Sequence, residues 1–238
     1  MRSEPLVLLT RPRGENERLA ARLLARGIPT CETPCVEVWP LEDARALRDT
    51  IGALTVDDLL VITSQAGARA VATAMGGAVC AAPVAAVGAA TASACQDAGL
   101  RVVFTPSVAS GRALAAELPL PRGSILLARS DRAIPEPLAI LAARGATPGE
   151  IVAYRTVPIA PREAIPDGAI AVFASPSAVD GFALSRARLA GAVAIGETAA
   201  ARARASLGIE AHVTGPDDGE IERAVCELVG GTDAIVRR

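Results

Sequence analysis

Lysine is missing from this chain of 238 residues, in which all 24 basic residues are arginines. A chain without lysine cannot form a Schiff base, anchor pyridoxal phosphate or supply the phosphate-binding lysine of a Walker motif. His212 is the only histidine, so a histidine-rich metal site is excluded, and nothing near His212 supports a Ser–His–Asp triad. The five cysteines are scattered, without a second cysteine or histidine pair at metal-site spacing. We therefore expect small core cysteines in a reducing cytoplasm and no bound metal.

Strong charge and long apolar runs are missing as well. The net charge is −2 at pH 7, which argues against a general nucleic-acid binder. Hydrophobic residues make up 51% of the chain, yet no uninterrupted apolar run approaches the length of a membrane span. No charged segment followed by an apolar one precedes the first predicted strand, so export is not signalled. The sequence thus predicts a cytoplasmic protein without membrane contact.

The sequence does contain a duplication, in two interleaved pieces. Residues Val7–Val38 resemble Ile125–Thr156 without gaps, and residues Asp58–Leu118 resemble Ala169–Leu228. The order along the chain is therefore A, B, A′, B′, which implies two similar domains. Because two similar domains usually face one another across a cleft, the protein is predicted to hold a ligand between its halves.

Short apolar strands alternate with amphipathic helices along the whole chain, and this pattern predicts an α/β fold with parallel sheets covered by helices on both faces. Piece A has two strands and piece B three, so one of each makes a five-stranded, flavodoxin-like doubly wound domain. The predicted strands cover residues 6–10, 30–39, 59–62, 84–87, 101–104, 124–128, 149–157, 169–173, 192–195 and 210–214. The predicted helices cover residues 16–26, 41–54, 65–75, 89–98, 112–118, 137–144, 178–184, 197–206 and 219–228.

The residues leave the pairing of the four pieces open. Pairing A with B and A′ with B′ would give tandem domains, whereas pairing A with B′ and B with A′ would give one discontinuous domain with the other inserted. The second arrangement needs two chain crossings. The extended, proline-bounded segments Pro34–Pro40 and Ile151–Pro158 occupy equivalent places in the repeat and would serve as those crossings.

Small hydroxyl residues, glycines and two arginines follow the predicted strands, in most cases just before a helix. Ligands of doubly wound folds bind at the carboxyl ends of the strands, where free backbone N–H groups at helix starts favour anions. A single serine or threonine at such a place is usually only a helix cap, but the same loop type recurs in both repeats. No G-x-G-x-x-G follows a strand, so a ligand with several carboxylates or phosphates is favoured over a dinucleotide. The candidate ligand-binding residues are Thr10, Arg11, Thr63, Ser64, Gly88, Thr91, Arg129, Ser175, Ser177, Gly196 and Thr198.

Tyr154, the only tyrosine, lies in the second extended segment. Composition alone favours a residue that packs at a domain edge. Once lysine, histidine and reactive cysteine are set aside, however, a tyrosine that faces a cleft is one of the few groups able to deliver a proton. The repeat places Tyr154 on Val36, so the duplication does not copy this tyrosine.

Six short motifs, in their order and spacing, resemble uroporphyrinogen-III synthase over nearly the whole chain. They are Leu8-Leu9-Thr10-Arg11-Pro12, Ile62-Thr63-Ser64, Val87-Gly88-x-x-Thr91-Ala92, Val152-Ala153-Tyr154-Arg155, Phe173-Ala174-Ser175-Pro176-Ser177 and Ala194-Ile195-Gly196-Glu197-Thr198. The resemblance implies the crossed pairing. One five-stranded domain would combine residues 1–34 and 159–238, an inserted α/β domain would take residues 39–150, and residues 35–38 and 151–158 would form a two-stranded connector.

The resemblance also implies a reaction in tetrapyrrole biosynthesis, the route to haem, sirohaem and cobalamin. Linear hydroxymethylbilane loses water and closes to uroporphyrinogen III with its last pyrrole ring inverted, and the family uses no metal or organic cofactor. The protein would then act mostly by positioning the substrate, because unguided closure gives the uninverted isomer. Tyr154 matches the family's tyrosine, which would donate a proton near the leaving hydroxyl. Thr91, Ser175 and Thr198 match polar positions of the family's cleft.

Two other interpretations stay open. Discontinuous domains with two crossings also suit a cytoplasmic module that binds or senses a small anion without catalysis, although no DNA-binding segment accompanies it. The chain could also be a family member that has lost catalysis. For the synthase, we expect a monomer whose ligand is hydroxymethylbilane and which makes transient contact with hydroxymethylbilane synthase.

Overall fold

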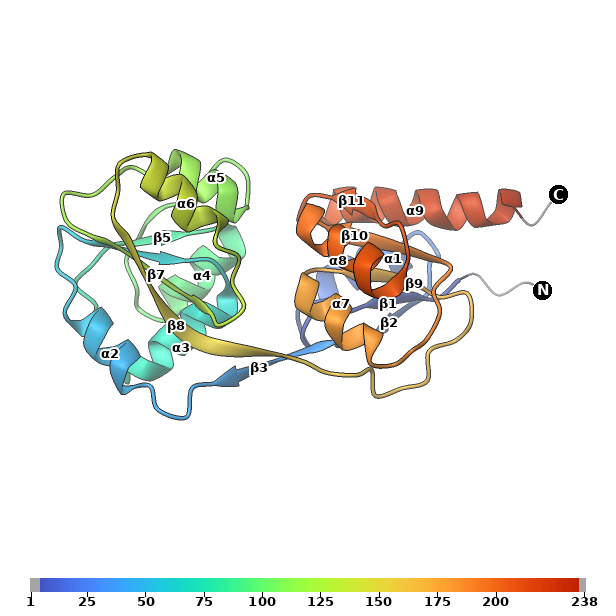
Figure 1. The fold of residues 1–238 in the computed structure, drawn as a ribbon, viewed down its shortest axis with the longest axis horizontal. Coiled ribbons are helices and arrows are strands. Elements are labelled where there is room, and N and C mark those ends of the chain that lie inside the picture. The colour runs from blue at the N-terminus through green and yellow to red at the C-terminus, as the bar shows by residue number, and fades with distance from the viewer. Residues whose placement is uncertain (1–4, 236–238) are drawn as a thin grey trace. The chain divides into compact units, whose positions relative to one another are not determined.

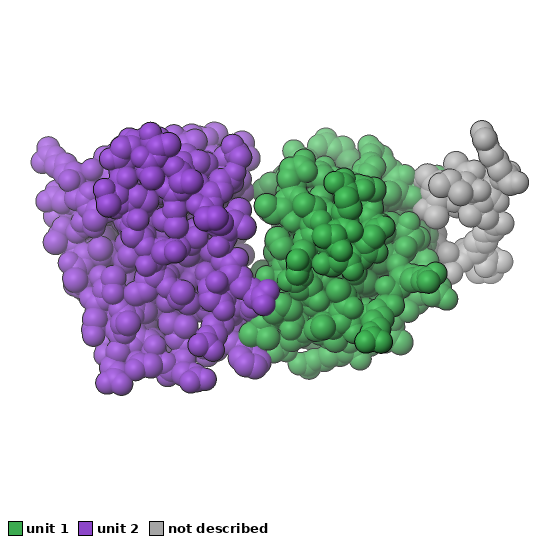
Figure 2. Space-filling view, viewed as in Figure 1, with its two compact units in different colours: residues 1–37, 157–238 green, residues 38–156 purple. Residues whose placement is uncertain are grey.

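The computed structural model describes residues 5–235, and the chain divides into two compact units (Figure 2). Unit 1 takes the chain up to Glu37 and again from Val157 onward, whereas unit 2 is the continuous segment Val38–Thr156. The chain therefore passes from one unit to the other twice. Within residues 5–235, no helix is long and apolar enough to cross a membrane.

Unit 1 is built on a parallel sheet with the strand order β11-β10-β9-β1-β2. Strand β1 pairs with β2 on one side and with β9 on the other, so segments from distant parts of the sequence share this sheet. The order reverses between β1 and β9, as expected for a doubly wound fold. The strands are β1 (Val7–Leu9), β2 (Thr30–Glu32), β9 (Ile170–Phe173), β10 (Gly191–Ile195) and β11 (His212–Thr214).

Helices cover both faces of this sheet (Figure 1). Helices α1 (Glu17–Leu24) and α9 (Asp218–Ile235) pack on the face that contains Leu9, while α7 (Pro176–Ala183) and α8 (Glu197–Leu207) pack on the face that contains Leu8. Since successive strand residues point to opposite faces, a strand buried on both sides must be apolar throughout. This requirement accounts for the continuous apolar run that predicted β1.

Unit 2 repeats the same plan with one strand added. Its strand order is β3-β8-β7-β4-β5-β6, in which β8 to β6 reproduce the order of unit 1 and β3 lies at the edge beside β8. The pairs from β8 through β6 are parallel. The strands are β3 (Val36–Pro40), β4 (Leu59–Ile62), β5 (Val84–Ala86), β6 (Val102–Phe104), β7 (Ile125–Ser130) and β8 (Pro148–Pro158). The α/β class with parallel sheets is confirmed.

The helices of unit 2 form two layers (Figure 1). Helices α5 (Gly111–Glu117) and α6 (Glu136–Ala143) lie side by side on one face of the sheet. Helices α2 (Arg45–Gly52), α3 (Gln65–Met75) and α4 (Ala89–Asp97) cover the other face, and their core includes Ile62 and Tyr154. The Tyr154 side chain therefore packs on the face of the sheet that α2, α3 and α4 cover.

Three predicted elements differ from the structure by more than two residues. The extended segment 30–39 is split into β2 and β3, with Pro34, which has no N–H to donate, between them. Helix α2 starts later than predicted, at Arg45, whose backbone N–H donates to the carboxylate of Asp43 at 2.9 Å. Helix α9 continues through the glycines at 230 and 231 to Ile235 instead of ending at Leu228.

Candidate active site

Tyr154 and Ser64 form a hydroxyl pair at the carboxyl end of β4. The Tyr154 hydroxyl lies 2.9 Å from Ser64 Oγ, and either oxygen can be the donor. Ser64 is extended (φ −161°, ψ 156°) and caps α3, because its Oγ accepts the backbone N–H of Gly67 at 2.9 Å. With that N–H bound to Oγ, the hydroxyl hydrogen of Ser64 is available to the phenol oxygen. The start of α3 thus holds a serine hydroxyl against the tyrosine.

The tyrosine ring is almost fully enclosed. Tyr154 is 8% exposed and belongs to the apolar cluster of unit 2 that contains Ile62 and Ala66. Gly67 brings α3 close to the strands here, since a Cβ at this position would lie 3.2 Å from Ser64 Oγ and 3.5 Å from the carbonyl oxygen of Ala128. An apolar wall around a single phenol strengthens the electrostatic interactions that its oxygen makes. This setting suits a proton donor.

The other candidate residues after β4 and β5 lie at the same edge of the sheet as Ser64. Thr63 is partly exposed directly after β4. Gly88 caps α4 without a side-chain hydrogen bond, and a Cβ there would lie 2.8 Å from the Cβ of Ala109. Thr91 is 5% exposed in the first turn of α4. Close packing therefore accounts for the glycine, and the backbone N–H groups at the start of α4 have no side-chain cap.

Arg129 lies on the opposite face of the sheet from Tyr154. Alternate residues of a strand point to the same face, so Arg129 lies on the face of Leu127, which packs against α5 and α6. Ala128, on the other face, belongs to the cluster of Tyr154. Arg129 is 5% exposed, and its Nε lies 3.0 Å from a carboxylate oxygen of Glu150 in β8. The angle is not that of a hydrogen bond, so Nε is a buried donor without a hydrogen-bond acceptor. Arg129 and Tyr154 therefore do not converge on one point.

The candidate loops of unit 1 repeat part of this geometry. Ser175 is extended (φ −162°, ψ 161°) and caps α7 by accepting the N–H of Ala178 at 3.2 Å, as Ser64 does for α3. Gly196 starts α8 with φ +82° and no side-chain cap, and its N–H donates to the carbonyl of Thr214 at 2.9 Å. Such a φ favours glycine. Ser177 is 8% exposed, whereas Thr198 is exposed.

Thr10 and Arg11 already have partners inside unit 1. Thr10 is fully buried, and its hydroxyl donates to the carbonyl of Val172 in β9 at 2.6 Å. The guanidinium of Arg11 lies 3.4 Å from the carboxylate of Asp218 at the start of α9. The geometry thus gives Thr10 a structural role, and a ligand carboxylate would have to compete with Asp218 for Arg11.

The sequence did not reveal a group of polar residues next to Tyr154. Asp131 donates its backbone N–H to the carbonyl of Tyr154 at 3.2 Å and accepts the N–H of Thr156 on its carboxylate at 2.9 Å. Ser130 joins both side chains. Their place in the sequence could have indicated them, because Ser130 ends β7, the strand that pairs with β8, and Asp131 follows it directly.

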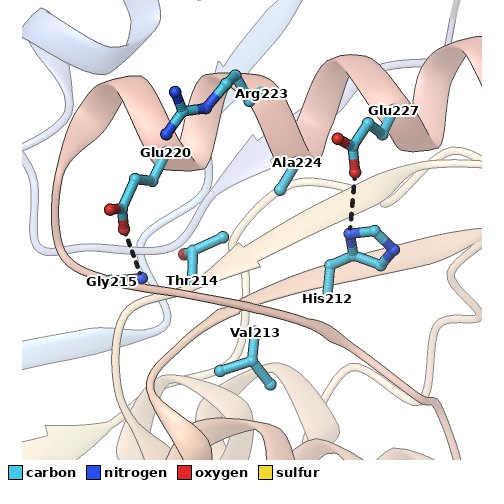
Figure 3. A pocket seen from close by; sticks show the side chains of 8 residues that line it. All are labelled: His212, Val213, Thr214, Gly215, Glu220, Arg223, Ala224 and Glu227. Atoms are coloured by element: carbon cyan, nitrogen blue, oxygen red, sulfur yellow. Dashed lines mark hydrogen bonds and ion pairs between the residues drawn. The ribbon is translucent and has the colours of Figure 1, made fainter.

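A surface hollow of about 530 Å³ lies elsewhere in unit 1, between β11 and α9 (Figure 3). The backbone N–H of Gly215 donates to Glu220 at 2.9 Å there, and His212 Nδ1 lies 3.6 Å from a carboxylate oxygen of Glu227. Both carboxylates that line the hollow therefore have partners within it. None of the predicted site residues lines it.

Metal ligands and reactive thiols do not gather in the part of the chain that the structure describes. Residues 5–235 contain no group of three or more His, Cys, Asp or Glu side chains able to hold a metal ion. Burial raises the pKa of the Cys35 thiol to about 12 and that of Cys95 to about 11. Both thiols therefore stay protonated at neutral pH, which makes them poor nucleophiles.

Comparisons with known proteins point to one family. The family model described as uroporphyrinogen-III synthase HemD matches residues 17–218. A solved mutant uroporphyrinogen III synthase of the thermophilic bacterium Thermus thermophilus is 22% identical with a TM-score of 0.57, and the match covers 98% of this chain and 100% of that one. The uroporphyrinogen-III synthetase of Helicobacter pylori is 18% identical with a TM-score of 0.58, over 96% and 99% of the two chains. At these identities the structures show the fold. No curated protein sequence matches the chain significantly.

Proposed function

Because the chain belongs to the uroporphyrinogen-III synthase family, a family of cyclising lyases in tetrapyrrole biosynthesis, we propose that Tyr154 is the proton donor of the cyclisation. One observation carries the proposal. The hydroxyl of the only tyrosine lies 2.9 Å from Ser64 Oγ, at the strand end where a doubly wound fold binds its ligand. The substrate of the family's reaction is linear hydroxymethylbilane.

The reaction begins when the terminal hydroxyl of the substrate leaves as water. The Tyr154 O–H donates its proton to that hydroxyl as the carbon–oxygen bond breaks, which leaves water, a phenolate and an azafulvenium cation that the far pyrrole ring attacks. The phenolate then accepts the O–H of Ser64, whose Oγ is bound by the N–H of Gly67 at the start of α3. A helix N-terminus favours negative charge, so α3 stabilises the phenolate through Ser64. The ring system loses a proton when it regains aromaticity after closure, and this proton returns to the phenolate.

Substrate carboxylates are proposed to bind where helices start without a side-chain cap. Gly88 is the N-cap residue of α4 and Gly196 that of α8, and neither caps its helix with a side chain, in contrast to Ser64 and Ser175. Their first-turn N–H groups are therefore open to anions. The polar residues proposed to assist are Thr63, Thr91, Ser177, Thr198 and Arg11. Arg129 is left out of this set because its side chain is buried beside Glu150.

We also propose that the enzyme acts in the cytoplasm as a monomer and receives its substrate through transient contact with hydroxymethylbilane synthase. The support is chemical. Free hydroxymethylbilane closes without guidance to the uninverted isomer, so a direct transfer would protect it.

The decisive assay supplies the purified protein with hydroxymethylbilane, oxidises the products and separates the isomers. We expect the type III isomer, formed faster than spontaneous closure. Formation of the type I isomer alone, at the spontaneous rate, would refute catalysis. Stabilisation of the protein against heat by small anions without turnover would then favour a binding module.

The role of Tyr154 is tested by Tyr154→Phe, which keeps the ring and removes the hydroxyl. The loss of a positioned proton donor should lower kcat by about 100-fold or more. The variant Ser64→Ala keeps the phenol but removes both its partner and the cap of α3. A loss of about tenfold in kcat is expected. Full activity in Tyr154→Phe would remove the tyrosine from the mechanism.

A further inference from the structure

A β-bulge determines which face of the sheet carries Tyr154. Strand β8 pairs residue by residue with β7 up to Arg129 and Val152, but Ser130 then pairs with Tyr154, so Ala153 is an extra residue. Side chains of a regular strand alternate between faces, yet Ala153 and Tyr154 both belong to the same apolar cluster. A bulge inserts one residue and redirects the side chain that follows. Without the bulge, Tyr154 would point to the face opposite Ser64.

Three side chains fasten the bulged strand to the end of β7. We call Ser130, Asp131 and Thr156 the staple. Asp131 Oδ1 accepts the N–H of Thr156 at 2.9 Å and the hydroxyl of Ser130 at 3.1 Å, and Ser130 Oγ lies 2.7 Å from Thr156 Oγ1. The Ser130 hydroxyl donates its only hydrogen to Asp131, so the Thr156 hydroxyl donates to Ser130 Oγ. The three groups thus close a ring of hydrogen bonds. The backbone N–H of Asp131 also donates to the carbonyl of Tyr154.

The first repeat contains neither the staple nor the tyrosine. The gapless alignment places Pro12, Arg13 and Val38 at the positions of Ser130, Asp131 and Thr156. Proline and valine side chains form no hydrogen bonds, so this ring cannot form there. The staple therefore accompanies the tyrosine and is not a general feature of the duplicated fold.

We propose that Asp131 is a positioning residue for Tyr154. Its carboxylate holds Thr156 and its N–H holds the Tyr154 carbonyl, one residue on either side of Arg155, and so it fixes the bulge that turns the phenol to Ser64. The predicted effect on turnover rests on the proposed function of Tyr154. The predicted effect on the position of the ring does not.

The test uses the single tyrosine as a spectroscopic probe. Protein labelled with 3-fluorotyrosine has one tyrosine ¹⁹F resonance, that of residue 154. Asp131→Ala should shift or broaden this resonance and lower kcat by about tenfold with little change in KM, because a misplaced catalytic group costs rate. Asp131→Asn should restore both, since its amide oxygen can accept the same two hydrogen bonds. Asp97→Ala, at the exposed end of α4, is the matched control and should change neither.

Each outcome separates positioning from the role of the tyrosine. An unchanged resonance in Asp131→Ala overturns the proposal. So does an equal loss of rate when Asp131→Ala is added to Tyr154→Phe, because Asp131 would then act independently of the phenol. A shifted resonance together with a fully active Tyr154→Phe supports the positioning and refutes the proton donor. If Asp131→Ala fails to fold, Ser130→Ala, which opens the same ring, is judged by the same resonance.

Discussion

Gly181→Ala should destabilise unit 1, because α7 has no space for a methyl group at this position. A Cβ on residue 181 would overlap the carbonyl oxygen of Cys35 and lie 2.6 Å from that of Ile159. These two residues flank the segments that cross between the units, and the N–H of Ile159 donates to the carbonyl of Cys35 at 2.9 Å. Both obstacles are backbone atoms, so no side-chain rotation can relieve the overlap.

The size of the effect follows from two opposing contributions. Alanine is favoured over glycine inside a helix by about 1 kcal/mol. A carbon–oxygen contact normally needs about 3.3 Å, so α7 would have to move by roughly 1 Å away from both crossings. Val179 and Phe182 of the same helix are fully buried, and such a shift would loosen their packing. We expect a net loss of about 3 kcal/mol, at the upper end for an overpacked site.

Urea unfolding followed by circular dichroism measures this loss. For a unit of this size, a loss of about 3 kcal/mol corresponds to a decrease of roughly 2 M in the urea midpoint. Gly52→Ala is the matched control, because a Cβ at the end of α2 meets nothing within 4 Å. Its midpoint should stay unchanged or rise slightly. A midpoint for Gly181→Ala within about 0.5 M of the wild-type value would refute the argument.

Three further predictions concern charges and thiols. The Asp58 carboxylate accepts hydrogen bonds from the backbone N–H groups of Thr55 and Ser124, and these bonds hold its pKa well below the ordinary value of 3.8. Asp58→Ala should therefore lower the urea midpoint at pH 7. The difference in midpoint between the variant and the wild type should narrow as the pH falls below about 4, because the wild-type carboxylate is then protonated. A difference that stays constant down to about pH 2 contradicts this. The buried thiols of Cys35 and Cys95 should react with iodoacetamide at about pH 8 only after unfolding, as mass spectrometry of the folded protein can check. Glu222→Ala removes the carboxylate of α9 that binds Arg22 in α1 and Arg26 just after it, so its urea midpoint should fall in low salt and approach wild type in concentrated salt. Equal midpoints in low salt would exclude the linkage.

Much of the fold could be predicted from local patterns. Buried parallel strands such as Leu59–Ile62 are continuous apolar runs, and helices such as Gln65–Met75 end at glycines that adopt a positive φ. Ser64 and Ser175 could be predicted as helix caps because a serine before a helix satisfies the same N–H groups in either repeat. These features depend on neighbours within a few residues, so the sequence carries them directly.

The candidate site was only partly predictable. Strand ends can be located from the sequence, but the partners of a side chain cannot. Thr10 was expected to face a ligand, yet its hydroxyl donates to Val172, a residue far along the chain. Arg129 and Tyr154 were expected to serve one site, but strand parity and the bulge place them on opposite faces.

The α/β class, the duplication and the uniqueness of Tyr154 are fixed by the order of residues, because periodicity, repetition and composition are properties of the chain alone. Folding was needed to place β1 beside β9, since parallel strands carry no local record of their partners. Folding also brought Tyr154 to Ser64, because one extra residue in β8 reverses the face of a strand. The hydrogen bonds that hold that residue join Asp131 to Thr156, two residues that meet only after β7 and β8 have paired.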